Sequence, residues 1–142
     1  MLRLSKLSDY AIMILASLPE RAGAPVSASS LADKTGLPEP TVSKVLKLLS
    51  AANDLVISTR GIKGGYVAAH PLNSMSIADV ITAVEGPIAL TTCVDGGDEN
   101  CTFAAKCPMK GRWDMVNNVI KNTLKNITLD DILNSEYERK RA

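Results

Sequence analysis

The stretch that decides the fold reads Ser27-Ala-Ser-Ser-Leu-Ala-Asp-Lys-Thr-Gly36-Leu-Pro-Glu-Pro-Thr-Val-Ser-Lys-Val-Leu-Lys-Leu-Leu49. Ser27 is a favourable N-cap for a short helix over about 28–35, and Gly36 permits a turn with positive φ. A second helix is expected from about Pro40 to Ala52, because its apolar residues recur at helical spacing. A helix, a glycine-containing turn and a helix within about twenty-five residues predict a helix-turn-helix.

The second of these helices leaves a polar outer face made of Thr41, Ser43, Lys44 and Lys47. Short polar and basic side chains at this place on a recognition helix meet base edges and phosphates in the major groove. A helical hairpin that serves only the core would show the same apolar pattern. The outer face alone therefore leaves DNA binding and a purely structural hairpin as alternatives.

The hydrophobic period changes after the second helix. Leu55–Thr59 and Tyr66–Ala69 are β-prone, and the glycine-rich segment between them predicts a hairpin, which after a helix-turn-helix is a wing. Arg60, beside the glycine tip, is suited to entering a narrow minor groove. Lys63 adds a second cation at the tip, and Asp54 is the only acid in residues 40–65. Taken together, helix and wing favour double-stranded DNA as a partner over a solvated loop tip.

Three further helices are expected, over about 6–18, 77–85 and 112–126, and Thr128 can cap one more. The helix over 112–126 carries a narrow apolar stripe on Trp113, Val116, Ile120, Thr123 and Ile127. Such a stripe packs on its own domain or forms a two-helix dimer contact. We expect a homodimer, because DNA readers of this size usually need two half-sites for affinity.

The expected fold class is mainly α with a small β-hairpin wing, a winged helix-turn-helix followed by a long C-terminal dimerisation helix. We expect a DNA-binding domain over 1–87, a cysteine loop over 88–111, and the dimerisation helix with a charged tail over 112–142. The 142 residues carry a net charge of +1, but residues 1–72 hold +3 and residues 73–142 hold −2. No signal peptide is apparent and the apolar run 11–18 is too short to span a bilayer, so a cytoplasmic location is expected.

All three cysteines, Cys93, Cys101 and Cys107, lie within fifteen residues of a glycine- and acid-rich loop. In the cytoplasm such cysteines are metal ligands, redox sensors or idle thiols rather than a disulfide framework. The Cys-x7-Cys-x5-Cys spacing is not that of a zinc ribbon, and it favours an iron–sulfur cluster over a thiol switch, and a thiol switch over a zinc site with His70. Clusters usually take four protein ligands, so a fourth must come from elsewhere. With a single histidine and no phosphate-binding loop, an enzyme is not expected.

The chain resembles the iron–sulfur-sensing winged-helix regulators that include IscR and NsrR, and it looks most similar to the branch that regulates the SUF assembly system. The resemblance rests on the cysteines and on five motifs: Leu4-Ser-Lys-Leu-Ser-Asp-Tyr-Ala11, Leu31-Ala-Asp-Lys-Thr-Gly-Leu37, Thr41-Val-Ser-Lys-Val-Leu-Lys-Leu-Leu49, Arg60-Gly-Ile-Lys-Gly-Gly-Tyr66 and Ile81-Thr-Ala-Val-Glu-Gly-Pro87. It implies a homodimer that binds promoter DNA and carries one cluster per chain, [2Fe-2S] or [4Fe-4S].

By this resemblance the metal ligands are Cys93, Cys101 and Cys107, and Arg60 is the minor-groove arginine. IscR-like members have a histidine three residues after the last cysteine, where this chain has Lys110. NsrR-like members use an aspartate in the first helix of the partner chain, and Asp9 stands at that position. The function implied is transcriptional control by iron–sulfur or redox status, with iron–sulfur assembly genes as targets. A metal-free thiol switch on DNA and a winged-helix protein-interaction module remain alternatives.

Overall fold

The structure is a computed structural model that describes residues 3–52, 55–94 and 101–134. Within these residues the order of elements is α1 (Lys6–Ser17), α2 (Ala28–Thr35), α3 (Glu39–Ala51), β1 (Val56–Thr59), β2 (Gly65–Ala68), η1 (Leu72–Ser74), α4 (Ile77–Glu85), α5 (Trp113–Lys125) and α6 (Leu129–Leu133). The predicted fold class, mainly helical with a two-stranded antiparallel hairpin, is confirmed. Asp54, the glycine- and acid-rich residues 95–100 and the charged tail lie outside the described residues.

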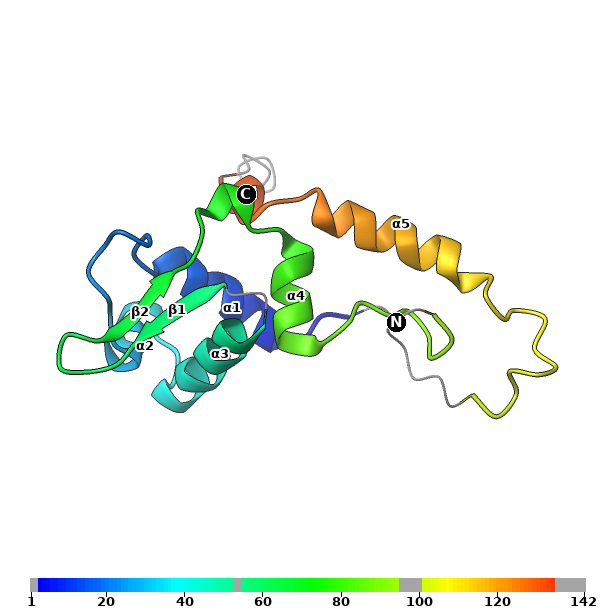
Figure 1. The fold of residues 1–142 in the computed structure, drawn as a ribbon, viewed down its shortest axis with the longest axis horizontal. Helices are drawn as coiled ribbons and strands as arrows, with labels where there is room; N and C mark the ends of the chain where they lie inside the picture. The colour runs from blue at the N-terminus through cyan, green and yellow to red at the C-terminus, as the bar shows by residue number, and fades with distance from the viewer. Residues whose placement is uncertain (1–2, 53–54, 95–100, 135–142) are drawn as a thin grey trace.

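The core lies where α1, α3 and α4 pack together, and it is made almost entirely of aliphatic side chains. Ile14, Leu46 and Val80 are fully buried, one from each of the three helices. Burying a side chain of this size stabilises a fold by roughly 1.5–3 kcal/mol. Figure 1 shows the body formed by α1–α4 and the hairpin, with α5 extending from it as an arm and the cysteine segment at the far end.

The helix ends follow the capping residues in the sequence. The Ser27 hydroxyl accepts a hydrogen bond from Ser30 N at 3.1 Å, and Gly36 ends α2 in the left-handed region with φ of 74°. Capping boxes begin α4 at Ser76 and α6 at Thr128, each closed by an aspartate three residues later. These caps satisfy backbone N–H groups that the first turns of the three helices would otherwise leave unpaired: one in α2, two in α4 and two in α6.

The hairpin is braced by a third segment that the sequence pattern does not predict. Val26 N donates to Tyr66 O at 3.1 Å and Tyr66 N donates to Val26 O at 2.8 Å, so the linker before α2 pairs with β2. A single bridge of this kind has no hydrophobic period and leaves no sequence signal. It ties the base of the wing to the body and so fixes the direction in which the wing points.

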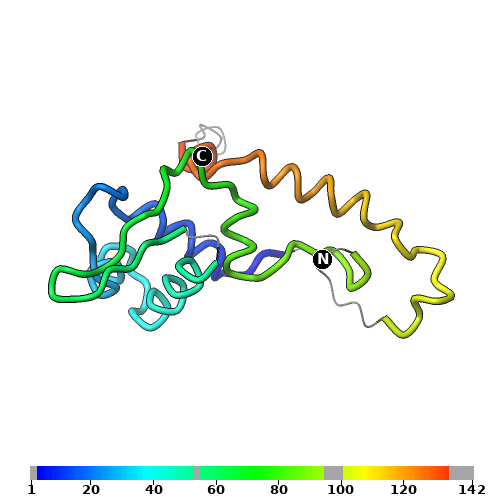
Figure 2. Tube along the Cα trace, viewed as in Figure 1, coloured from blue at the N-terminus to red at the C-terminus, as the bar shows by residue number. Residues whose placement is uncertain are grey.

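After α5 the chain returns to the body. Thirteen residues of helix span roughly 20 Å, and Figure 2 shows the trace running back along α5 from the cysteine segment. Leu129 N then donates to Met75 O at 2.9 Å, and the Leu129 side chain is fully buried in the main core. The C-terminal end of the arm is therefore attached to the body. None of the described helices has the length and hydropathy that crossing a membrane requires.

Candidate metal centre and DNA-binding surface

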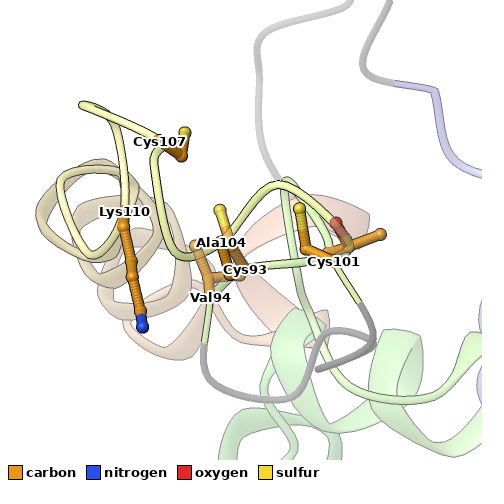
Figure 3. A pocket seen from close by; sticks show the side chains of 7 residues that line it. Cys93, Val94, Cys101, Ala104, Cys107 and Lys110 are labelled. Atoms are coloured by element: carbon orange, nitrogen blue, oxygen red, sulfur yellow. The ribbon is translucent and has the colours of Figure 1, made fainter.

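The three cysteines line one cavity of about 300 Å³, together with Thr92, Val94, Ala104 and Lys110. Cys93 approaches from the segment after α4, whereas Cys101 and Cys107 belong to the segment that leads into α5 (Figure 3). All three thiols are half-buried and none forms a disulfide. The structure therefore brings together the three residues predicted from the sequence as metal ligands.

Successive tight turns shape the second half of the cavity. Cys101 O accepts a hydrogen bond from Ala104 N at 3.1 Å, and Cys107 O accepts one from Lys110 N at 3.3 Å. Each cysteine thus begins a turn, and Gly111, with φ of 73°, reverses the chain before α5. These turns keep both thiols close to the start of the arm.

The donor set is compatible with an iron–sulfur cluster. Thiolates are the soft ligands that select iron–sulfur clusters, zinc or copper. Among the described residues, no three His, Cys, Asp or Glu side chains approach as closely as one metal ion requires. A cavity of about 300 Å³ between the thiols offers the room that a multi-iron core with bridging sulfides needs. His70, the residue needed by the zinc alternative, is exposed at the end of the hairpin and is not among the residues that line this cavity.

Two residues, Lys110 and Asp9, bear on the fourth ligand position. Lys110 lines the cavity, but in Figure 3 its amino group extends away from the three sulfur atoms. Asp9 is exposed in the first turn of α1 and does not line the cavity of its own chain. Its predicted role concerns a second copy of the chain, and it stays a prediction.

A hydroxyl group lies against the first cysteine. Thr91 Oγ1 and Cys93 Sγ are 3.1 Å apart, close enough for the hydroxyl to donate to a thiolate. Hydrogen bonds to the ligand atoms of a metal site orient those ligands and tune the metal. Sequence reasoning missed Thr91, because a threonine two residues before a cysteine is not a recognisable pattern.

A fully buried amide holds the segment before Cys93 against the arm. Asn117 of α5 is 1% exposed; its Oδ1 accepts from Leu90 N at 3.0 Å and its Nδ2 donates to Ile88 O at 3.2 Å. The sequence carried a signal for this residue, since an asparagine lies between Trp113 and Ile120 on the apolar side of the helix. A buried polar side chain needs partners, and here both are backbone groups.

The other end of the same segment is fixed to the first helix. The Glu85 carboxylate accepts hydrogen bonds from Ser5 N and Ser5 Oγ, both at 2.9 Å, and from the hydroxyl of Ser8. Ser5 is the N-cap residue of α1, and Glu85 accepts from its backbone N–H, as the carboxylate of the third helical residue does in a capping box. These hydrogen bonds hold the pKa of Glu85 below its usual value. The bond from the Ser8 hydroxyl contributes most, and the bonds from Ser5 add to it.

Glu85→Gln is expected to lower the free energy of unfolding by roughly 0.5–1 kcal/mol at pH 7, the value of an exposed helix cap. Because the folded-state pKa is depressed, this stabilisation is present above the unfolded-state pKa and is lost as the pH falls through the folded-state value. Urea unfolding of both proteins between pH 7 and pH 3 should show the difference shrinking toward zero in acid. A difference that does not vary with pH would contradict the charged cap.

The candidate DNA-binding residues lie on α3 and the wing, at the end of the molecule opposite to the cysteines (Figure 1). Lys44, Lys47, Arg60 and Lys63 are exposed, whereas Thr41 and Ser43 are half-buried. α3 leads directly toward β1, and Leu55 N donates to Leu49 O at 3.2 Å. This bond ties the end of α3 to the base of the wing, and the four exposed cations lie on these two elements.

Glycine is required at two positions of the wing for steric reasons. A Cβ on Gly64 would lie 2.1 Å from Thr59 O, and one on Gly65 would lie 2.5 Å from Val26 O. Neither backbone oxygen can move without breaking the hairpin or its third segment. The Gly-Gly pair therefore sets the shape of the tip that presents Arg60 and Lys63.

α5 has two apolar sides rather than the one stripe expected from the sequence. Ile120 and Leu124 are half-buried and face a second cavity against the end of α4 and residues 86–90. A second set of apolar residues, here named the outer apolar face, is exposed and consists of Trp113, Met115, Val116 and Val119. Val119 is 62% exposed. Contiguous exposed apolar residues on a helix mark an association surface.

Comparisons with known proteins agree with this architecture. The chain is 29% identical over 137 residues to the HTH-type transcriptional regulator IscR of Pectobacterium carotovorum, covering 95% of this chain and 81% of the relative. The solved structure of IscR from T. potens matches with a TM-score of 0.61 and 30% identity, over 99% of this chain and 93% of that one. CymR, the global cysteine regulator of B. subtilis, matches with a TM-score of 0.63 and 28% identity, over 93% and 96%.

A sequence profile described as "Rrf2: Iron-dependent Transcriptional regulator" matches residues 4–135, which is nearly the whole chain. The match includes the helix-turn-helix, the wing, the three cysteines and α5. The predicted resemblance to IscR-type regulators is thereby confirmed. The chain belongs to the Rrf2 family of transcriptional regulators.

Proposed function

We propose that this regulator senses iron–sulfur or redox status through a cluster held by Cys93, Cys101 and Cys107, and that it controls promoters of iron–sulfur assembly genes from the cytoplasm. The observation that carries the proposal is the single cavity lined by all three thiols. The similarity to IscR proteins over most of the chain supports it. Asp9 of a second chain is proposed as the fourth ligand, and the cluster type is open between [2Fe-2S] and [4Fe-4S].

In this proposal the chain's own residues connect the cavity with the DNA-binding surface. A bound cluster supplies redox-active iron held by thiolates. Thr91 donates to the Cys93 sulfur, and the turns at Cys101 and Cys107 hold the other two thiols near α5. Asn117 and Glu85 fix the segment between the cavity and the body at its two ends. A change in the order of the cysteine segment thereby alters how the body is placed on DNA.

DNA recognition in the proposal uses Thr41, Ser43 and Lys44 on base edges, Lys47 and Lys63 on phosphates, and Arg60 in the minor groove. The test is a binding titration of the anaerobically purified protein, with and without its cluster, on sites selected from a random DNA pool. The expected result is salt-dependent binding whose Kd differs between the two forms. Salt-independent or undetectable binding by both forms would favour a protein-interaction module instead.

A metal-free thiol switch is the second candidate, and a specific observation favours it. All three cysteines are free and only half-buried, so that their thiols are open to oxidation. The structural similarity to CymR, described as a cysteine regulator, is compatible with it. In that case oxidation by a disulfide reagent changes DNA affinity in iron-free protein.

A homodimer through the outer apolar face is also proposed. Val119→Lys is expected to raise the dimer Kd by at least about tenfold, roughly 1.4 kcal/mol, because it adds a charge to that face. Sedimentation velocity across a concentration series measures the change. The control is Asn118→Lys, which adds the same charge to an exposed neighbour on another side of α5. Equal dissociation constants for both variants would exclude this face as the interface.

A further inference from the structure

One buried side chain, that of Asn117, joins the arm to the segment that leads from the body to the cysteine cavity. Asn117 is among the largest fully buried side chains of the described residues, and with Ser8 and Ser76 it is one of three buried polar ones. It bridges α5 to residues 88–90, which lead to Cys93 without a helix or strand of their own. Its Oδ1 and its Nδ2 are each engaged with one backbone group of that segment.

The chemistry of the amide matters, because the two backbone groups have opposite needs. Leu90 N requires an acceptor and Ile88 O requires a donor, and a correctly oriented carboxamide supplies both. In the folded protein, Asn117 is the partner of both Leu90 N and Ile88 O. When the segment separates from α5, the buried amide loses both partners, which costs more than an ordinary exposed hydrogen bond.

The hydrogen bonds of Asn117 lie close enough in the chain to Cys93 to affect the position of that cysteine. Leu90 is three residues before Cys93, and Thr91, between them, contacts the Cys93 sulfur. In the other direction, the segment begins at Gly86, next to the Glu85 carboxylate that holds α1. Residues 86–90 are therefore held at two places. Glu85 holds their start on the body, and Asn117 holds their end on α5.

We propose that Asn117 is the positioning residue that couples the state of the cysteine cavity to the arm, by holding residues 88–90 on α5 when the three thiols are bound and releasing them when they are free. This inference rests on the proposed cluster. The coupling has two arrangements, one with the carboxamide bonded to Leu90 and Ile88 and one with that segment detached from α5. Release of residues 88–90 changes the packing of α5, and α5 carries the outer apolar face proposed as the dimer contact. Asn117 can therefore affect DNA binding without touching DNA.

The test uses Asn117→Asp, which keeps an acceptor for Leu90 N but places a carboxylate against Ile88 O. Asn117→Leu, similar in size and without polar atoms, is the second variant, and Asn118→Asp is the matched control on an exposed neighbour. We expect both variants at position 117 to keep iron and acid-labile sulfide within about twofold of the wild type. The ratio of DNA Kd between cluster-bound and cluster-free protein should fall toward 1 in both, and stay at the wild-type value in Asn118→Asp.

A second readout does not depend on DNA. Amide hydrogen exchange of a peptide covering residues 86–92 should be slow in the cluster-bound wild type, faster after chelation of iron, and fast in both forms of Asn117→Asp. An unchanged DNA-affinity ratio in both variants, equal exchange in the two forms of the wild type, or loss of cluster from both variants would overturn the inference. A wild type that binds no cluster would contradict the proposed function. Slow exchange of residues 86–92 in cluster-free wild-type protein would contradict the coupling, whether or not a cluster can bind.

Discussion

Arg60→Ala is expected to weaken DNA binding by roughly 10- to 100-fold, which corresponds to about 1.4–2.8 kcal/mol. The side chain is exposed at the start of the wing tip, on a turn whose shape is set by Gly64 and Gly65. An arginine held in a narrow minor groove gains from the enhanced negative potential there, and a dimer would present two of them. Electrophoretic or anisotropy titrations on a selected site measure the loss.

Two controls separate this role from general charge. Lys63→Ala removes a cation from the same tip, and it should reduce the slope of log K against log salt by about 1 with a smaller loss of affinity. Lys125→Ala removes an exposed cation from the last turn of α5 and should leave binding nearly unchanged. Equal losses from Arg60→Ala and Lys63→Ala, with equal changes in salt slope, would place Arg60 on phosphates instead.

Cys101→Ser is expected to reduce bound iron and acid-labile sulfide at least about tenfold and to abolish the visible absorption, since clusters are held by thiolates. Cys93→Ser and Cys107→Ser should behave in the same way, because the three thiols line one cavity. Lys110→Ala is the matched control, for it changes a cavity residue that is not a proposed ligand. Iron and sulfide are quantified after purification without oxygen.

Asp9→Ala belongs to the same series and tests the ligand proposed from the partner chain. It should shift the absorption spectrum while leaving most of the iron bound, because the three thiolates stay in place. An unchanged spectrum would count against Asp9. If Lys110→Ala lost as much iron as Cys101→Ser, the distinction between ligands and lining residues would fail.

The helices and the wing could be predicted from the sequence because their signals are local. The ranges of α2 and α4 agree with the prediction at both ends, since Ser27, Gly36 and Ser76 mark them by backbone chemistry. α3 begins one residue earlier than expected, at Glu39, because Pro40 is tolerated in the first turn of a helix. β1 is one residue shorter than predicted, because it begins at Val56, and β2 lies one residue earlier than predicted, at Gly65–Ala68. Ala69 N still donates to Leu55 O at 3.0 Å.

Long-range partners could not be predicted in the same way. That Glu85 caps α1, that Val26 pairs with Tyr66 and that Leu129 enters the core each depend on contacts between distant residues. The apolar stripe of α5 was visible in the sequence, but not its division between an inner side and an outer apolar face. For the cavity, spacing and family resemblance predicted the three cysteines. The contact of Thr91 with Cys93 and the backbone partners of Asn117 depend on the three-dimensional arrangement, although the place of Asn117 on the apolar side of the helix is visible in the sequence.

The central claim is that Cys93, Cys101 and Cys107 hold an iron–sulfur cluster, and its most direct test is the iron and acid-labile sulfide content of the wild-type protein purified without oxygen. The predicted result is coloured protein containing iron and sulfide in about equal amounts, both lost in Cys101→Ser. Colourless protein, free of iron and of sulfide even after reconstitution with both, would contradict it.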